Sequence, residues 1–200
     1  MSYALRLSFV ASLSACGGTS ADISMTGTNA FAATSTIMLT KGLHCHSGLL
    51  PSGNLDALTV VVADIDLGPT CPTNVFDFLP HVLQLEVATG GYFASDPSSA
   101  NQPISPGMTF PILNEHVTDE ELCGNVPAGT TQPTAVAMLH ECPNGSPCSY
   151  AKQFFASAGS ITVSSVSSTS ATGTFDLTLV NMDGESGGAL SGSFSALPCP

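Results

Sequence analysis

The last third of the chain carries its clearest pattern of apolar and polar positions. Residues 174–179, TFDLTL, place an apolar residue at every second position, and residues 189–196, ALSGSFSA, do the same with serines between them. A period of two sends alternate side chains to opposite faces of a β-strand. Each segment is therefore predicted to be a strand with one buried face and one face in solvent.

We expect these two segments to pair as an antiparallel hairpin. In the expected register, Phe175 pairs with Phe194, Leu177 with Gly192, and Leu179 with Leu190, so that the apolar residues share one face. On the other face, Asp176 would pair with Ser193 and Thr178 with Ser191. Residues 181–188 then form the hairpin loop, with Asp183-Gly184 as its turn signal.

Strand patterns dominate the rest of the chain as well. Residues 58–65, LTVVVADI, form a β-branched run that predicts a strand buried on both faces. Residues 83–87 alternate as a half-buried strand, with Gln84 and Glu86 on the polar side, and residues 134–140 and 161–168 read as further strands. One short helix is expected from Thr118, in a capping box with Glu121, to its end at Gly124. This pattern predicts an all-β fold, an antiparallel β-sandwich or jelly-roll-like domain.

Residues 1–16 have the features of an export signal. Arg6 and the amino terminus supply positive charge, residues 7–13 are mostly apolar, and Ser14-Ala15 are small. The apolar part is shorter than the ~20 residues that a membrane-spanning helix needs. We therefore expect residues 1–15 to be a cleaved signal peptide.

The segment Leu13-Ser14-Ala15-Cys16 resembles the lipobox of bacterial lipoproteins. The resemblance implies cleavage before Cys16, a diacylglycerol on its sulfur and an acyl chain on the new amino terminus, which together hold a protein stably on a membrane. Gly17 stands where inner-membrane lipoproteins carry aspartate, which favours the outer membrane. The ending GTFDLTL…LSGSFSALPC is similar to the tails of β-rich bacterial surface lipoproteins that have no assigned activity. The expected organisation is a signal peptide at 1–15, a lipidated cysteine and short tether at 16–21, and a single domain at 22–200.

The number of cysteines agrees with this interpretation. The chain has seven, and setting Cys16 aside for lipid leaves six. An even number in an exported chain predicts three disulfides that brace the domain. They would involve Cys45, Cys71, Cys123, Cys142, Cys148 and Cys199, and a local bridge between Cys142 and Cys148 would span a turn-rich segment. No C-x₂-C pair is present, so the usual zinc spacing is missing.

The charge balance excludes some partners. Fifteen acidic residues against three lysines and arginines give a net charge of −12. Nucleic acid is excluded because its binding needs lysine and arginine to neutralise phosphates. An anionic membrane surface is likewise unsuited as a partner, apart from the anchoring lipid itself. A glycan or another envelope protein remains open as a partner.

Four residues are candidate metal ligands. His44 and His46 flank Cys45 and would face the same side of a strand, while Asp64 and Asp66 share a face at the end of a buried strand. Calcium is the expected ion at carboxylates of this kind, and Asn181, Asp183 and Glu185 carry oxygen at alternate loop positions. The alternative interpretation is that Asp and Asn simply favour turns at strand ends. Neither set of oxygen-bearing residues matches a complete calcium loop, so calcium stays an open alternative and no cofactor is expected beyond the lipid on Cys16.

Two further patterns bear on catalysis and on sugar binding. GESGG, residues 184–188, is similar to the nucleophile motif of trypsin-like proteases, but it lies in the expected hairpin loop with only fourteen residues after Ser186. Stacking platforms for sugars are limited to Tyr92, Phe93 and Tyr150, because the chain has no tryptophan. We therefore expect a lipid-anchored envelope protein with a binding, adhesion or structural role and no catalytic residues. The alternatives are a carbohydrate- or calcium-binding module and a secreted hydrolase.

Overall fold

The protein is described here from a computed structural model. The structure describes residues 23–39, 56–65, 81–89, 102–113, 133–142 and 152–198. The expected signal peptide, lipidated cysteine, tether and short helix lie outside these residues. Within them, no helix is long and apolar enough to cross a membrane.

The described residues form nine β-strands, which confirms the predicted all-β class. The strands are β1 (Ser24–Gly27), β2 (Ser35–Leu39), β3 (Ala57–Ala63), β4 (His81–Ala88), β5 (Met108–Pro111), β6 (Thr134–Glu141), β7 (Lys152–Val166), β8 (Ala171–Asn181) and β9 (Ser186–Pro198). Their pairing is antiparallel except where β2 meets β9.

The strands make one continuous sheet instead of the two separate sheets of a sandwich. Pairing runs from β2 through β3, β4, β6, β7, β8 and β9, and β9 then returns to β2 through the parallel contact of Ile37 with Leu197. The long strands β7 and β9 change partners along their length. β7 pairs with β6 at its start and with β5 farther on, while β9 pairs first with β1 and then with β2. Long, twisted strands can turn a corner in this way, so a single sheet folds over into two layers.

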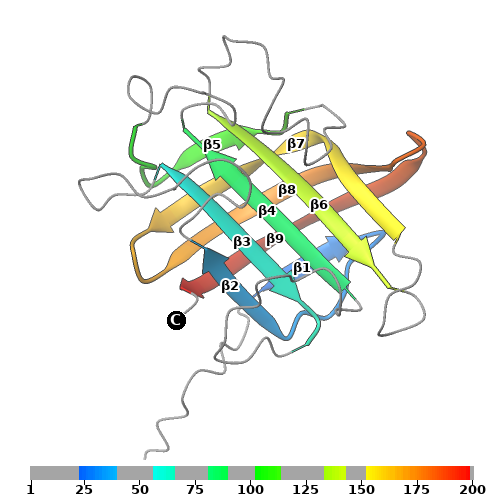
Figure 1. The fold of residues 1–200 in the computed structure, drawn as a ribbon, viewed down its shortest axis with the longest axis horizontal. Helices are drawn as coiled ribbons and strands as arrows, with labels where there is room; N and C mark the ends of the chain where they lie inside the picture. The colour runs from blue at the N-terminus through cyan, green and yellow to red at the C-terminus, as the bar shows by residue number, and fades with distance from the viewer. Residues whose placement is uncertain are drawn as a thin grey trace, which may run out of the picture.

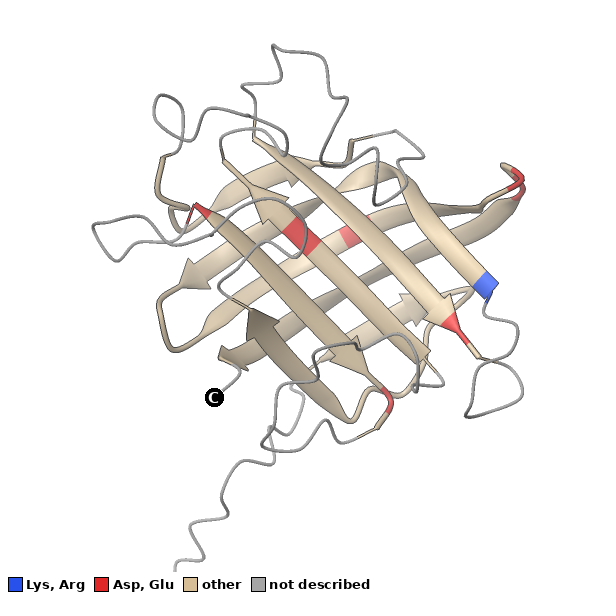
Figure 2. Cartoon of the chain, viewed as in Figure 1, with Lys and Arg blue, Asp and Glu red and all other residues tan. Residues whose placement is uncertain are grey.

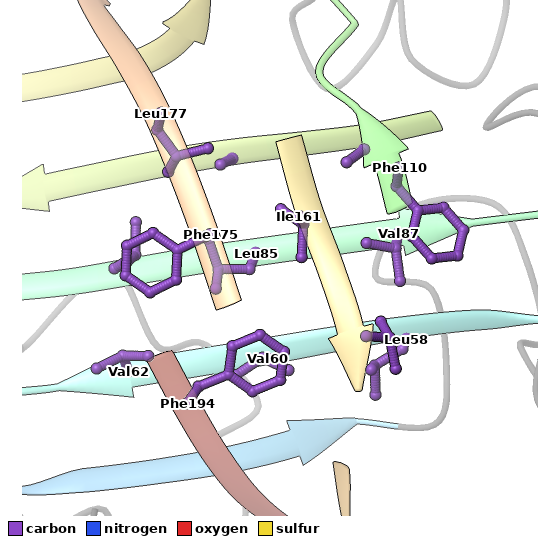
Figure 3. Close-up of a cluster of buried hydrophobic side chains, with 14 of the residues drawn as sticks. Leu58, Val60, Val62, Leu85, Val87, Phe110, Ile161, Phe175, Leu177 and Phe194 are labelled. Atoms are coloured by element: carbon purple, nitrogen blue, oxygen red, sulfur yellow. The ribbon is translucent and has the colours of Figure 1, made fainter. Parts of the chain in front are cut away.

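The two layers cross each other and enclose the core. The front layer contains β2, β3, β4 and β6, and the back layer contains β1, β9, β8, β7 and β5 (Figure 1). Phe175 and Phe194 project from the back layer toward Leu85 and Val60 of the front layer (Figure 3). These four side chains are at most 3% exposed, so the core lies where the layers cross.

The front layer is buried more completely than the sequence pattern predicts. Every residue of β3 is buried, which confirms the predicted run at 58–65 as far as Ala63; Asp64 and Ile65 follow the strand and are half-buried and exposed. The prediction of a half-buried β4 is wrong, because Gln84 and Glu86 are only 4% and 2% exposed. Gln84 Nε2 donates a hydrogen bond to Glu86 Oε1, which offsets part of the cost of burying the two polar groups. Strand β4 lies between β3 and β6, in the middle of this layer.

The hairpin of β8 and β9 has the predicted faces but a different register. Phe175 pairs with Gly192 and Leu177 with Leu190, two residues away from the predicted partners. A shift of two residues keeps each side chain on its original face, so the apolar residues still share the core side. The loop is shorter than expected, because β8 continues to Asn181 and β9 begins at Ser186. The turn at Asp183-Gly184 is confirmed, with Gly184 at a φ of +79°.

Only one of the predicted disulfide cysteines belongs to the described residues. Cys142 follows β6, is 5% exposed and is disulfide-bonded. Its partner and the other predicted bridge cysteines lie outside those residues, so the pattern of three bridges stays a prediction.

Candidate functional site

The carboxylate of Asp64 is engaged by a histidine that the sequence did not single out. Asp64 follows β3 and His81 begins β4, so the two residues are neighbours across the antiparallel pair. His81 Nδ1 lies 2.7 Å from Asp64 Oδ2, and the backbone N–H of His81 donates to Asp64 Oδ1 at 3.3 Å. Both oxygens of the Asp64 carboxylate are therefore engaged by His81.

The ring of His81 is fixed from a second side by Phe31. The two ring centroids are 5.4 Å apart and the planes are nearly parallel, with an angle of 21° between them. The His81 side chain is 35% exposed and that of Asp64 is 19% exposed. With Nδ1 committed to Asp64, Nε2 is the nitrogen left to exchange a proton or to bind a ligand. The His81 imidazole therefore has a fixed orientation and remains partly accessible to solvent.

The His81–Asp64 pair belongs to a row of ionisable residues at one end of the front layer. His81 is opposite Glu141 on β6, and Glu141 is opposite Lys152 on β7. Lys152 is the only lysine or arginine within the described ranges, and it appears as the single blue position in Figure 2. In that part of the chain, no three His, Cys, Asp or Glu residues are grouped so that they could hold a metal ion.

The other three of the four candidate metal ligands lie outside the described residues. These are His44, His46 and Asp66. The aromatic candidates for sugar stacking, Tyr92, Phe93 and Tyr150, also lie outside them. The predicted metal and sugar sites therefore stay predictions.

The oxygen-bearing loop at the tip of the β8–β9 hairpin has a structural explanation. Asn181 Oδ1 accepts the backbone N–H groups of Asp183 at 3.0 Å and of Glu185 at 2.8 Å. Asn181 Nδ2 donates to Glu185 Oε2 at 3.0 Å. These bonds close the turn, which supports the interpretation of Asn and Asp as turn residues. Ser186, the serine of GESGG, starts β9 beside this turn and accepts the N–H of Gly188 at 3.2 Å.

The outward side of the back layer is lined by hydroxyl groups, and we call it the hydroxyl face. One row of it crosses five strands in register, from β1 through β9, β8 and β7 to β5. The residues of this row are Ser24, Ser193, Thr174, Thr162 and Thr109. At each end of this row two hydroxyl groups lie within hydrogen-bond distance of each other. Ser24 Oγ is 3.0 Å from Ser193 Oγ, and Thr109 Oγ1 is 2.9 Å from Thr162 Oγ1.

A second row runs beside the first and contains the one charge of this face. Its members are Thr26, Ser191, Asp176 and Ser160, and Thr26 Oγ1 lies 3.1 Å from Ser191 Oγ. Ser165, Thr172, Thr178 and Ser195 extend the face on either side of the two rows. All of these side chains are exposed or half-buried. The hydroxyl face is therefore polar and almost uncharged, in a chain whose net charge is −12.

The alternation in the sequence predicted the solvent-facing serines and threonines of β8 and β9, but it did not reveal that five strands join their hydroxyls in one surface.

Comparison with known proteins finds no matching family, no similar curated protein and no similar solved structure.

Proposed function

We propose that this chain is an exported bacterial lipoprotein, held on the outer membrane by lipid on Cys16. Its all-β domain would have a non-enzymatic role in binding, adhesion or envelope structure. Support for the anchor comes from the motif Leu13-Ser14-Ala15-Cys16, which follows an apolar segment. Support for a binding role comes from one observation, the hydroxyl face, which extends over five strands.

The surface chemistry fits a role in the envelope. Serine and threonine hydroxyls both donate and accept hydrogen bonds, so a face built from them can contact neutral polar groups of many kinds. The face carries no lysine or arginine, which makes it unsuited to nucleic acid. We also propose that the six remaining cysteines form three disulfides, in keeping with an oxidising compartment.

The intact mass of the detergent-extracted protein tests the anchor and the bridges together. We expect a mass that starts at Cys16 and includes acyl chains, with six cysteines alkylated only after reduction. The Cys16→Ser variant is the matched control and should lack the acyl chains. A wild-type mass without lipid would contradict the anchor, and thiols that alkylate before reduction would contradict the three bridges.

The His81–Asp64 pair favours a second candidate, the secreted hydrolase. A carboxylate that holds Nδ1 of a histidine orients the ring and supports proton transfer at Nε2. The test is a screen of ester, amide and glycoside substrates with wild-type protein and two variants that make the same change in different places. Activity that falls in Asp64→Asn and persists in Asp183→Asn would support the hydrolase. Inactivity of the wild type on every substrate, or equal activity in the two variants, would argue against it.

A further inference from the structure

We infer that the hydroxyl face is the side of the domain that turns toward the membrane and rests on its lipid headgroups. This inference depends on the proposed lipid anchor at Cys16. It concerns the orientation of the domain, which the anchor alone does not define. Three observations carry it: the position of β1, the distribution of charge and the exposure of Leu197.

The first observation is the short stretch of chain between the anchor and the hydroxyl face. Ser24 is the first residue of β1 and also the first member of the row that crosses five strands. It follows Cys16 by eight positions. Eight residues span at most about 28 Å, because an extended chain covers ~3.3–3.6 Å per residue. The edge of the hydroxyl face is therefore held close to any membrane that holds Cys16.

The second observation is the separation of this face from the acidic residues. Of the seven acidic residues in the described part of the chain, only Asp176 lies on the hydroxyl face. The others lie on or beside strands of the front layer and at the tip of the β8–β9 hairpin (Figure 2). Bacterial membranes with anionic lipids repel acidic surfaces within about a Debye length of ~10 Å. Among the described surfaces, the hydroxyl face, with Asp176 as its one carboxylate, is therefore the one that such a bilayer repels least.

The third observation is an exposed leucine on the same side of β9. Ala196 points into the core and is fully buried, so its neighbour Leu197 points outward and is 46% exposed. It follows Ser191, Ser193 and Ser195 along the outward edge of the strand. The hydroxyls can exchange hydrogen bonds with phosphate and ester oxygens, and Leu197 can enter the boundary of the acyl region. Each contact is weak, but a short tether raises the effective concentration of the face to the millimolar range.

Oxidative footprinting of the lipidated protein tests this orientation. The full protein is reconstituted in phosphatidylcholine vesicles containing phosphatidylglycerol, and hydroxyl radicals then label exposed side chains. Leu197 reports on the end of β9 that borders the hydroxyl face, and Met182, which is 64% exposed at the tip of the β8–β9 hairpin, reports on the opposite end of the same strand pair. We expect labelling of Leu197 to fall several-fold from detergent micelles to vesicles, with Met182 unchanged. Equal protection of the two residues, or protection of Met182 alone, would overturn the inference.

Two charge variants sharpen the test. Thr174→Glu adds a carboxylate at the centre of the face, and Gln102→Glu adds the same group at an exposed position beside Thr89, at the end of β4 in the front layer. Thr174→Glu should restore the labelling of Leu197 in vesicles, whereas Gln102→Glu should leave it protected. Protection of Leu197 by a neutral polysaccharide in detergent, and not by vesicles, would show a glycan-binding face instead and overturn the inference. The intact mass of the same sample shows whether Cys16 is lipidated, so failure of the anchor is seen separately.

Discussion

Phe194 of β9 lies directly across from Gly173 of β8, and its ring fills the space that a side chain on Gly173 would need. A Cβ built on Gly173 would lie 2.5 Å from Phe194 Cζ. The neighbouring pair repeats the arrangement in reverse, because Phe175 lies across from Gly192 and a Cβ there would lie 2.7 Å from Phe175 Cζ. Each phenylalanine covers a glycine on the partner strand, which fixes the register of the hairpin.

Gly173→Ala should therefore destabilise the domain. The new methyl group would meet both the Phe194 ring and the carbonyl oxygen of Thr162, so one of the two strands must move. Overpacking of this kind costs about 1–3 kcal/mol of unfolding free energy. Urea denaturation measures the loss, with Thr174→Ala on the exposed side of the same strand as the control. Equal stability of Gly173→Ala and wild type would show that the ring does not occupy this space.

Deletion of a buried leucine should cost far more than deletion of an exposed one. Leu85 is 1% exposed in the core, whereas Leu197 is 46% exposed at the end of β9. Leu85→Ala should lower the free energy of unfolding by about 2–5 kcal/mol, because it leaves a cavity between the two layers. Leu197→Ala should change it by less than about 0.5 kcal/mol. Similar losses from the two substitutions, measured by chemical denaturation, would be inconsistent with the described core.

Asn181 should stabilise the β8–β9 turn more than its acidic neighbour does. Its side chain makes three hydrogen bonds that close the loop, whereas the Asp183 carboxylate accepts none from the described residues. Asn181→Ala should cost about 1–2 kcal/mol, at the net value typical of protein hydrogen bonds. Asp183→Ala is the control and should be nearly neutral in thermal unfolding. A rise in melting temperature on adding calcium, abolished by Asp183→Ala, would instead reveal a cation site at this loop.

The His81–Asp64 pair should contribute little to stability. Both side chains are partly exposed, so solvent screens their attraction. In a double-mutant cycle with His81→Gln and Asp64→Asn, we expect a coupling energy below about 1 kcal/mol that shrinks as salt is added. Denaturation at low and high ionic strength measures it. A much larger coupling that salt does not change would mean that the pair is shielded from solvent.

The sequence alone determined the strand class and the sides on which most side chains lie. The alternation around Phe175 and Phe194 follows from the geometry of a single strand, so it assigned the buried and exposed faces correctly. The unbroken run at 58–65 likewise identified β3 as buried on both faces. These are local properties, and a local pattern is sufficient to predict them.

Only the tertiary structure decided which strands meet and in which register. The two-residue shift of the hairpin preserves every face, so alternation cannot detect it, and the fit of each phenylalanine ring over a glycine selects the observed pairing. The burial of Gln84 and Glu86 depends on the place of β4 within its layer. The His81–Asp64 pair and the hydroxyl face arise between segments far apart in the chain. Contacts of this kind depend on how the sheet folds over on itself. Each contact needs two segments, and the pattern within one segment does not show which other segment will lie beside it.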